Sequence, residues 1–141
     1  MDKLNNIMQH ICLENKNKSI ILYEKSNSYI YESLKFLKIT YQHLSQLEEL
    51  MKLDSDNILL LLSIDENIIN SDDLYRKIGS IILKYPDNFI IINKTKKADY
   101  LDDPLHKRLM SLGFKLSSQI SHDDIFFLFY TYNIGSYKNS P

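Results

Sequence analysis

The sequence predicts an α/β protein with three layers: a mostly parallel sheet of about six strands between helices on both faces. Three observations predict this fold class. Helical and strand patterns alternate along the chain, which is typical of parallel sheets. The segment Ile58–Ile64 is apolar on both faces, as expected of a strand covered from both sides. The last two strand patterns are joined by a short turn, which predicts a C-terminal antiparallel β-hairpin.

Length and composition fit a single domain. The chain has 141 residues, 44% of them hydrophobic, which is enough to build a real core. We therefore predict one domain over residues 1–141, with an irregular tail over residues 133–141. The net charge is −1, from 17 basic and 18 acidic residues. This balance argues against a dedicated binder of nucleic acid or of an anionic membrane, which needs a cationic surface.

The single cysteine, Cys12, excludes an intrachain disulfide and favours a reducing compartment. The N-terminus carries an early acidic residue and no long apolar run, so it does not resemble a signal peptide. The longest apolar stretch, Ile58–Leu62, is far shorter than the roughly 20 residues of a bilayer span. We therefore expect a cytoplasmic protein without membrane contact.

The first third of the chain predicts two helices and two strands. Apolar residues at helical spacing over Leu4–Cys12 predict a helix, and Ile20–Tyr23 predicts a buried strand. Ser26–Ser28 is a turn and a possible helix N-cap. Apolar residues over Ile30–Leu37 again have helical spacing, and Ile39–Gln42 predicts a second, weaker strand.

The middle of the chain contains the clearest strand. Ser45 and Glu48 match a capping box, which predicts that a short helix with Leu47–Met51 begins there. Asp54–Asn57 reads as a loop. The continuously apolar run Ile58–Ile64 then predicts a strand in the middle of a parallel sheet.

A helix and a strand follow. Ser71–Asp73 predicts the start of a helix, because acidic groups suit the positive end of the helix dipole. The helix continues through Ile82 and is stopped by Pro86. Phe89–Ile92 predicts the next buried strand. Lys94–Asp102 reads as a polar loop and as the most mobile segment.

The last third predicts a helix and the hairpin. Asp103 and Pro104 together form a strong helix start, and Gly113 is a natural left-handed terminator. Lys115–Ile120 and Ile125–Tyr132 then form the two strands of the hairpin. Its aromatic side chains point alternately to both faces of the sheet, and we therefore consider a homodimer through this edge.

This order of elements resembles the class I S-adenosylmethionine-dependent methyltransferase fold, a Rossmann-like architecture. Ile58–Ile64 resembles the family's central fourth strand and Phe89–Asn93 its fifth. Leu112-Gly113-Phe114 resembles the sequence that closes the family's last helix, and the hairpin resembles its closing strands. The tail from Tyr132 to Lys138, with Pro141 after it, also resembles the end of an uncharacterised bacterial family known only as a domain of unknown function.

The first half of the chain departs from that family in three ways. Glu24 matches an acidic position after the family's first strand, but no glycine-rich loop follows it. A strand–helix unit is missing between Gln42 and Ile58. His43 stands about where the family has an acidic residue that holds the cofactor ribose. Because glycines let backbone approach the cofactor, we expect no cofactor, S-adenosylmethionine included.

Two carboxylates nevertheless follow predicted parallel strands, Glu24 and Asp65. Ligands of open α/β sheets bind outside the carboxyl ends of the strands, so we predict a crevice there that binds a polar small molecule. A simpler interpretation is that these are solvated loop residues and a helix cap. The predicted ligand-binding residues are Glu24, Ser26, Ser28, His43, Asp65 and Asn67.

Other polar clusters have simpler explanations. His122-Asp123-Asp124 could hold a metal or act in acid–base chemistry, but it fits a polar hairpin turn. The run Lys94–Lys97 fits a solvated loop. The four histidines lack metal-ligand spacing, and we predict no metal site. The sequence leaves any catalytic residue unidentified.

These observations lead to three hypotheses. The first is a small bacterial protein with a reduced methyltransferase-like fold that binds an unidentified partner or a small ligand without catalysis. The second is a methyltransferase with an atypical cofactor loop, in which the resemblance implies that Glu24 holds the cofactor and Asp65 lies near the transfer site. The third is a homodimeric interaction module that uses the aromatic hairpin.

Overall fold

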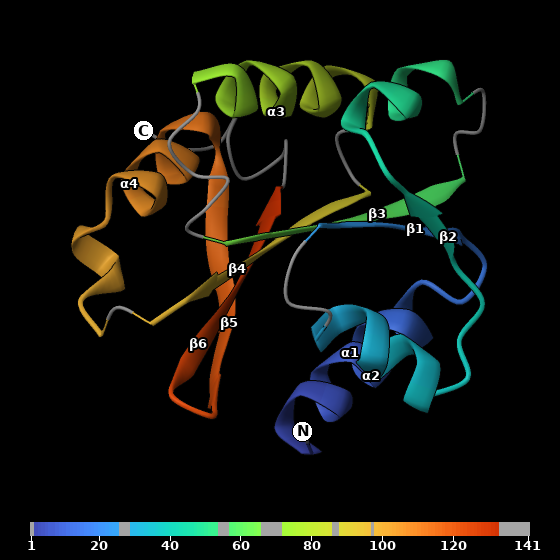
Figure 1. Ribbon diagram of the computed structural model, residues 1–141. Helices are drawn as coiled ribbons and strands as arrows, with labels where there is room; N and C mark the ends of the chain where they lie inside the picture. Colours follow the sequence, from blue (N-terminus) through green and yellow to red (C-terminus); the bar gives the residue numbers. More distant parts are fainter. Residues whose placement is uncertain are drawn as a thin grey trace.

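A computed structural model describes residues 2–25, 29–53, 57–65, 72–85, 88–96 and 98–132 of the chain. It contains a six-stranded sheet with the order β2-β1-β3-β4-β6-β5. Strands β1 to β4 are parallel to one another, and β6 runs antiparallel to both β4 and β5. The predicted fold class, a mostly parallel α/β sheet with a C-terminal antiparallel hairpin, is confirmed (Figure 1). The strands are β1 (Ser19–Glu24), β2 (Gln42–Leu44), β3 (Ile58–Asp65), β4 (Phe89–Thr95), β5 (Phe114–His122) and β6 (Ile125–Tyr132).

Helices cover both faces of the sheet and enclose two separate apolar clusters. One cluster packs under α1 (Asp2–Glu14) and α2 (Tyr29–Phe36). The other packs under α3 (Asp72–Lys84), α4 (Pro104–Leu112) and the 3₁₀ helix η1 (Leu47–Lys52). A second 3₁₀ helix, η2 (Tyr100–Asp102), precedes α4. Figure 1 shows α1 and α2 below the sheet and α3 above it.

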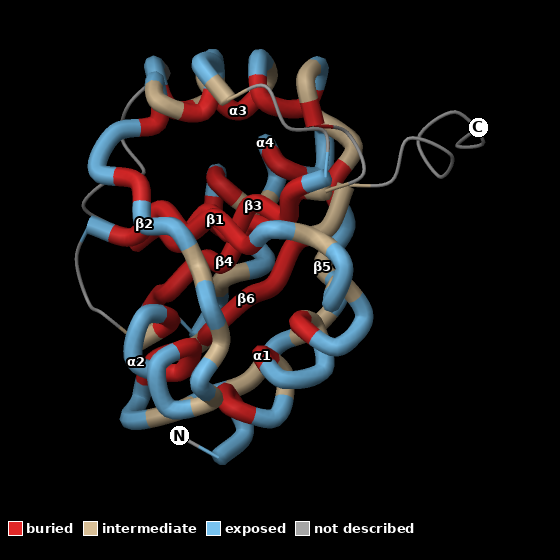
Figure 2. Tube along the Cα trace, turned by 90° about the vertical axis from the view of Figure 1, so that its right-hand side faces the viewer, coloured by how far each residue is buried: buried red, intermediate tan, exposed pale blue. Residues whose placement is uncertain are grey.

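Strand β3 is the centre of the molecule, as the sequence predicts. All eight of its residues are buried, and it lies between β1 and β4 in the sheet. Its alternate side chains enter the two clusters: Leu60 and Leu62 on the α3 side, Leu59 and Leu61 on the α1 side. Figure 2 shows the buried strands inside a shell of exposed helical turns.

The predicted signals at the two ends of α4 are confirmed. The Asp103 carboxylate accepts a hydrogen bond from the Leu105 N–H at 3.1 Å, and Pro104 follows in the first turn. Gly113 ends the helix with a left-handed φ of 105°, a conformation that glycine adopts without strain. The hairpin turn uses Asp123 and Asp124, which also have positive φ, 51° and 62°, as a two-residue turn between twisted strands requires.

The predicted strand Ile39–Gln42 is displaced: β2 begins at Gln42 and ends at Leu44. Lys38 leaves α2 with a φ of 58°. Ile39 and Tyr41 then pack against the cluster under α1 and α2 before the chain reaches the sheet. The buried Leu44 joins the opposite cluster, and this contact decides which residues pair with β1.

The predicted capping box of Ser45 and Glu48 is also displaced by one residue. The Gln46 N–H and the Ser45 hydroxyl both donate to Glu49 Oε1, at 3.2 and 2.9 Å. Glu48 instead lies 2.6 Å from Lys77 Nζ on α3, and this hydrogen bond lowers the pKa of Glu48. The helix that follows is a 3₁₀ helix. Within the described residues, η1 is the element found between β2 and β3.

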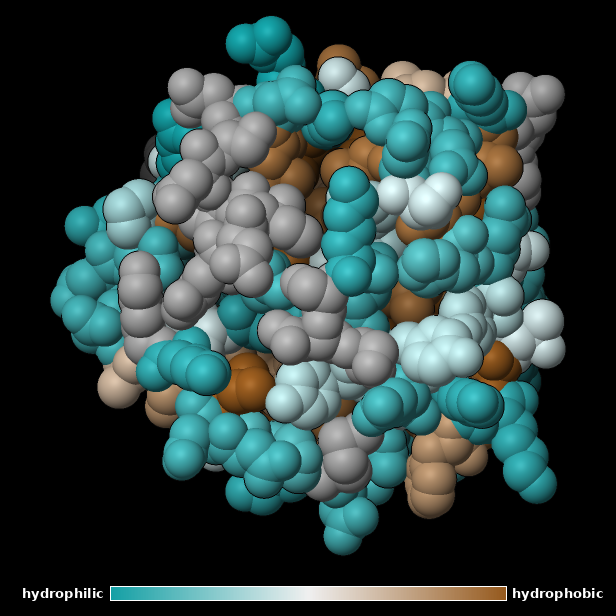
Figure 3. Space-filling view, in the orientation of Figure 1, coloured by the Kyte–Doolittle hydropathy of each residue, from teal (hydrophilic) through white to brown (hydrophobic). Residues whose placement is uncertain are grey.

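The surface of the described part of the molecule carries both hydrophobic and hydrophilic side chains. Figure 3 shows hydrophobic side chains emerging between hydrophilic ones in the upper half, where Figure 1 places α3. A groove of 200 Å³ lies between η1 and α3, with Leu47, Met51 and Ile81 among its lining residues. Among the helices that the structure describes, none combines the length and the apolar character needed to span a bilayer.

Candidate functional site

The candidate site lies where the direction of strand addition reverses. From β1 the chain adds β2 on one side and β3, then β4, on the other. The helix α2 that follows β1 and the helix α3 that follows β3 lie on opposite faces of the sheet. A crevice between such diverging connections is the usual ligand site of an open α/β sheet. Glu24 ends β1 and Asp65 ends β3, so both carboxylates belong to this edge, as predicted.

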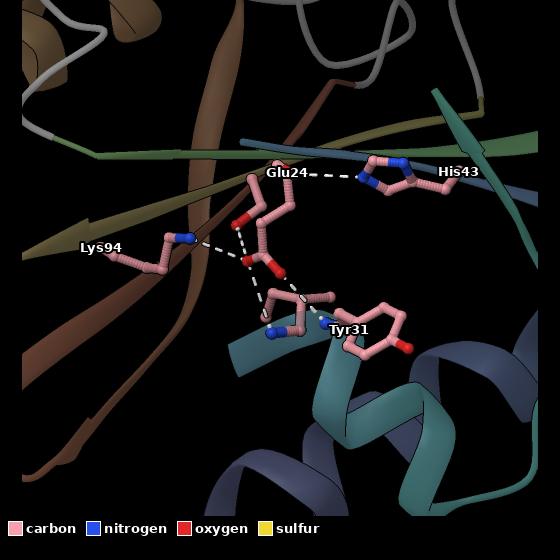
Figure 4. A network of polar contacts seen from close by, with 6 residues as sticks. Glu24, Tyr31, His43 and Lys94 are labelled. Carbon is pink, nitrogen blue, oxygen red and sulfur yellow. Dashed lines mark hydrogen bonds and ion pairs between the residues drawn. The ribbon is translucent and has the colours of Figure 1, made fainter. Parts of the chain in front are cut away.

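Glu24 is the centre of a buried polar network (Figure 4). Its side chain is 2% exposed, as is that of Lys94 at the end of β4, and Lys94 Nζ lies 2.8 Å from Glu24 Oε2. The Ser63 hydroxyl of β3 donates to the same oxygen at 2.6 Å. The backbone N–H groups of Tyr31 and Ile30 point at the carboxylate, at 3.1 and 3.4 Å.

This network joins four elements through one carboxylate. The N–H groups of Ile30 and Tyr31 belong to the first turn of α2, where a negative charge satisfies free donors and the helix dipole. Oε2 receives three of the four donors and Oε1 receives one. Glu24 therefore fixes α2 to β1, β3 and β4.

His43 and Asp65 complete the described part of this edge. His43 is exposed on β2, and its Nε2 lies 3.2 Å from the backbone oxygen of Glu24. Asp65 is 4% exposed and stands opposite Lys94 in the β3–β4 register. Glu24, Ser63, Asp65 and Lys94 thus lie at the carboxyl ends of three adjacent strands.

Three of the predicted ligand-binding residues, Glu24, His43 and Asp65, are brought together here. Ser26, Ser28 and Asn67 lie outside the described residues. A role of any of these residues in ligand binding stays a prediction.

Sequence reasoning missed Lys94 and Ser63. The run Lys94–Lys97 was predicted to be a solvated loop, and this is wrong for Lys94, because β4 continues through the buried residues Lys94 and Thr95. The prediction that a mobile loop begins at Lys94 is wrong for the same reason. One signal in the sequence could have indicated a buried lysine. Two carboxylates at the ends of adjacent buried strands require a cation nearby.

The other polar clusters have local roles. His122 Nε2 lies 3.1 Å from Asp123 Oδ2 in the hairpin turn. His106 Nδ1 lies 2.8 Å from the Tyr130 hydroxyl, and burial raises the pKa of Tyr130. No group of three or more potential metal ligands occurs in the described ranges. These contacts hold neighbouring elements together.

Solved structures with the same arrangement of elements are known. An S-adenosylmethionine-dependent methyltransferase from Clostridium acetobutylicum matches with a TM-score of 0.53 at 10% identity, over 94% of this chain and 92% of that one. A putative type 11 methyltransferase from Sulfolobus solfataricus matches with a TM-score of 0.53 at 17% identity, over 94% and 90%. The protein has the class I methyltransferase-like fold. No family profile and no curated protein match the sequence.

The expectation that this methyltransferase-like protein takes no cofactor is corrected by these comparisons. The Clostridium protein is S-adenosylmethionine-dependent. A Haemonchus contortus phosphoethanolamine methyltransferase, solved with S-adenosylhomocysteine, matches with a TM-score of 0.50 at 14% identity, over 94% of this chain and 38% of that one. A ligand of the S-adenosylmethionine type is therefore possible for this fold. The missing glycines, from which its absence was predicted, do not exclude it.

Proposed function

We propose that this protein binds a ligand of the S-adenosylmethionine type at the carboxyl edge of its sheet, in a binding role without methyl transfer. The observation that carries the proposal is the buried network around Glu24. The network orders the carboxyl edge of the sheet before a ligand binds, because it fixes α2 against the ends of β1, β3 and β4. We place this role in the cytoplasm, consistent with a single reduced cysteine.

The residue types at the edge bear on this ligand class. The edge holds two buried carboxylates, Glu24 and Asp65, and the buried ammonium group of Lys94, while the exposed Lys25 and Lys96 follow β1 and β4. S-adenosylmethionine carries a sulfonium and an ammonium group as well as a carboxylate, and carboxylates of the protein attract its cationic groups. The exposed imidazole of His43 adds a ring beside the same edge. In this proposal Asp65 and His43 contact the ligand, and Glu24 positions the edge.

The internal contacts of Glu24 support a role without catalysis. In the enzymatic alternative, Glu24 itself holds the cofactor. Here its carboxylate accepts four internal donors, and replacing it with alanine would break its buried ion pair with Lys94. The Glu24→Ala substitution would therefore report loss of structure as well as loss of binding, and a different variant is needed.

Calorimetric titration of S-adenosylmethionine and S-adenosylhomocysteine into the purified protein tests the proposal. We expect binding of both, weakened about tenfold by the isosteric change Asp65→Asn and also weakened by His43→Ala. The matched control His10→Ala changes an exposed histidine on α1 and should leave the affinity unchanged. Absence of binding for both compounds would overturn the ligand assignment. Conversion of S-adenosylmethionine to S-adenosylhomocysteine in the presence of candidate acceptors would overturn the non-catalytic role.

A further inference from the structure

A hollow lies at the amino ends of the parallel strands, opposite the edge that holds Glu24. It has a volume of 680 Å³ and is formed by the end of α1, the connection from α2 to β2, and the first residues of β1 and β2. Ile20 lines it, whereas Glu24 ends the same strand. Four residues of strand place the two positions about 13 Å apart. We call this hollow the amino-edge groove.

The inner part of the amino-edge groove is apolar. Cys12 and Ile20 line it and are only 8% and 7% exposed, and Leu37 and Ile39 also line it. Burial raises the pKa of the Cys12 thiol to about 11, so this group is neutral at physiological pH. The inner surface therefore suits a flat hydrocarbon or aromatic body.

The rim of the groove is polar and positively charged. Lys16 and Lys18 belong to the lining, and its residues, all within the described part of the chain, include no aspartate or glutamate. Lys18 Nζ donates to the neutral amide oxygen of Asn88, so its charge is not cancelled there. Burial, the neighbouring Tyr31 and the Glu24 charge raise the pKa of Tyr41, so its hydroxyl stays neutral.

The carboxyl end of α1 would by itself repel an anion, because free carbonyl groups gather there. Asn15 reduces this effect, since its Nδ2 donates to the Ile11 carbonyl at 2.8 Å and its N–H to the Cys12 carbonyl at 3.2 Å. Among the lining residues, the charged groups are the ammonium groups of Lys16 and Lys18, and the exposed Glu14 lies beside them at the end of α1.

We propose that the amino-edge groove binds an organic anion with a flat apolar body. The volume falls within the usual range for small-molecule sites, roughly 300–1,000 Å³. An apolar floor with a cationic rim and neutral hydrogen-bond donors matches one anionic group attached to a hydrophobic ring system. This site uses other residues than the function proposed above, although the Glu24 charge contributes to the raised pKa of the lining residue Tyr41.

The probe is 1-anilinonaphthalene-8-sulfonate, an aromatic sulfonate, compared with the uncharged N-phenyl-1-naphthylamine. Binding is read by fluorescence and, independently, by the rate at which N-ethylmaleimide alkylates Cys12. Because Cys12 is the single cysteine of the chain, this rate reports on one position inside the groove. We expect the sulfonate to bind and to slow alkylation at least fivefold at saturation, and the uncharged probe to bind more weakly.

Matched charge reversals locate the site. Lys16→Glu should weaken sulfonate binding about fivefold, the scale of one exposed charge pair. Lys115→Glu makes the same charge change on the exposed start of β5 and should have no effect. Thr40→Trp, which fills the groove from its rim, should abolish protection of Cys12 while the protein stays folded by circular dichroism. Sulfonate binding that leaves the alkylation rate unchanged, or equal effects of the two reversals, would overturn the proposal.

Discussion

At the scale of single residues, the most consequential interaction is the buried pair of Glu24 and Lys94. Taking two charges out of water costs several kcal/mol for each ion. The attraction between them offsets this cost only with good geometry and additional donors, which Ser63 and α2 supply. The pair therefore specifies how four elements meet, although a neutral pair of similar size could be equally stable.

We predict a strongly non-additive mutant cycle at this pair. Lys94→Met and Glu24→Gln should each lower the free energy of unfolding by about 3–5 kcal/mol, because each breaks a buried ion pair. The double variant should cost clearly less than the sum of the two, since it removes both members of the pair together. Urea unfolding followed by circular dichroism measures all four proteins.

The control is Lys77→Met, which removes a partly exposed lysine from Glu48 and Asp73. It should cost less than about 1 kcal/mol. If the effects of Lys94→Met and Glu24→Gln simply add, the two groups do not act as a pair and the structural role assigned to Glu24 is wrong.

At the scale of elements, the sequence predicted those helix ends and strands that are determined by contacts between residues close in the chain. The N-cap and terminating glycine of α4, and the doubly buried β3, were predictable because their causes lie within a few residues of the sequence. The end of β4 and the place of β2 were not. The sequence around Lys94 predicts a solvated side chain, because its partner Glu24 lies 70 positions away in the chain. The pairing of β2 depends on which cluster Leu44 enters, and a single sequence does not contain this information.

Two glycines in helical contexts should respond oppositely to the same substitution. Gly79 lies inside α3, and a Cβ added there meets nothing within 4 Å. Gly79→Ala should therefore raise stability by about 0.5–1 kcal/mol. Gly113 ends α4 with a φ of 105°, so Gly113→Ala should lower stability by about 1 kcal/mol or more. Thermal unfolding of the two variants measures both effects, and a shift of the same sign in both would contradict this assignment.

At the scale of the whole molecule, β5 lies at the edge of the sheet and pairs on one side only among the described strands. Its first half carries the exposed Lys115 and a register irregularity between Leu116 and Ser118, features that discourage pairing with another strand. Its second half, Ser118–His122, lacks both. A homodimer through this hairpin edge remains a prediction, and the second half of β5 is where a two-fold contact would form.

Light scattering over a range of protein concentrations tests this prediction. We expect a dimer whose fraction rises with concentration. Ser121→Lys should lower that fraction, because a symmetric contact brings the two added charges close together. Ser80→Lys on the exposed face of α3 is the matched control and should leave the fraction unchanged. A monomer at every concentration would rule out the dimer.

The position of β6 has a consequence for biosynthesis. β6 follows β5 in the chain, yet it lies between β4 and β5 in the sheet. A nascent chain that has left the ribosome as far as His122 would therefore present β4 with an unpaired, apolar edge and β5 with no neighbour. The sheet closes only when the segment Ile125–Tyr132 inserts between them. Translation that halts before this point would leave an open edge available to chaperones or to aggregation.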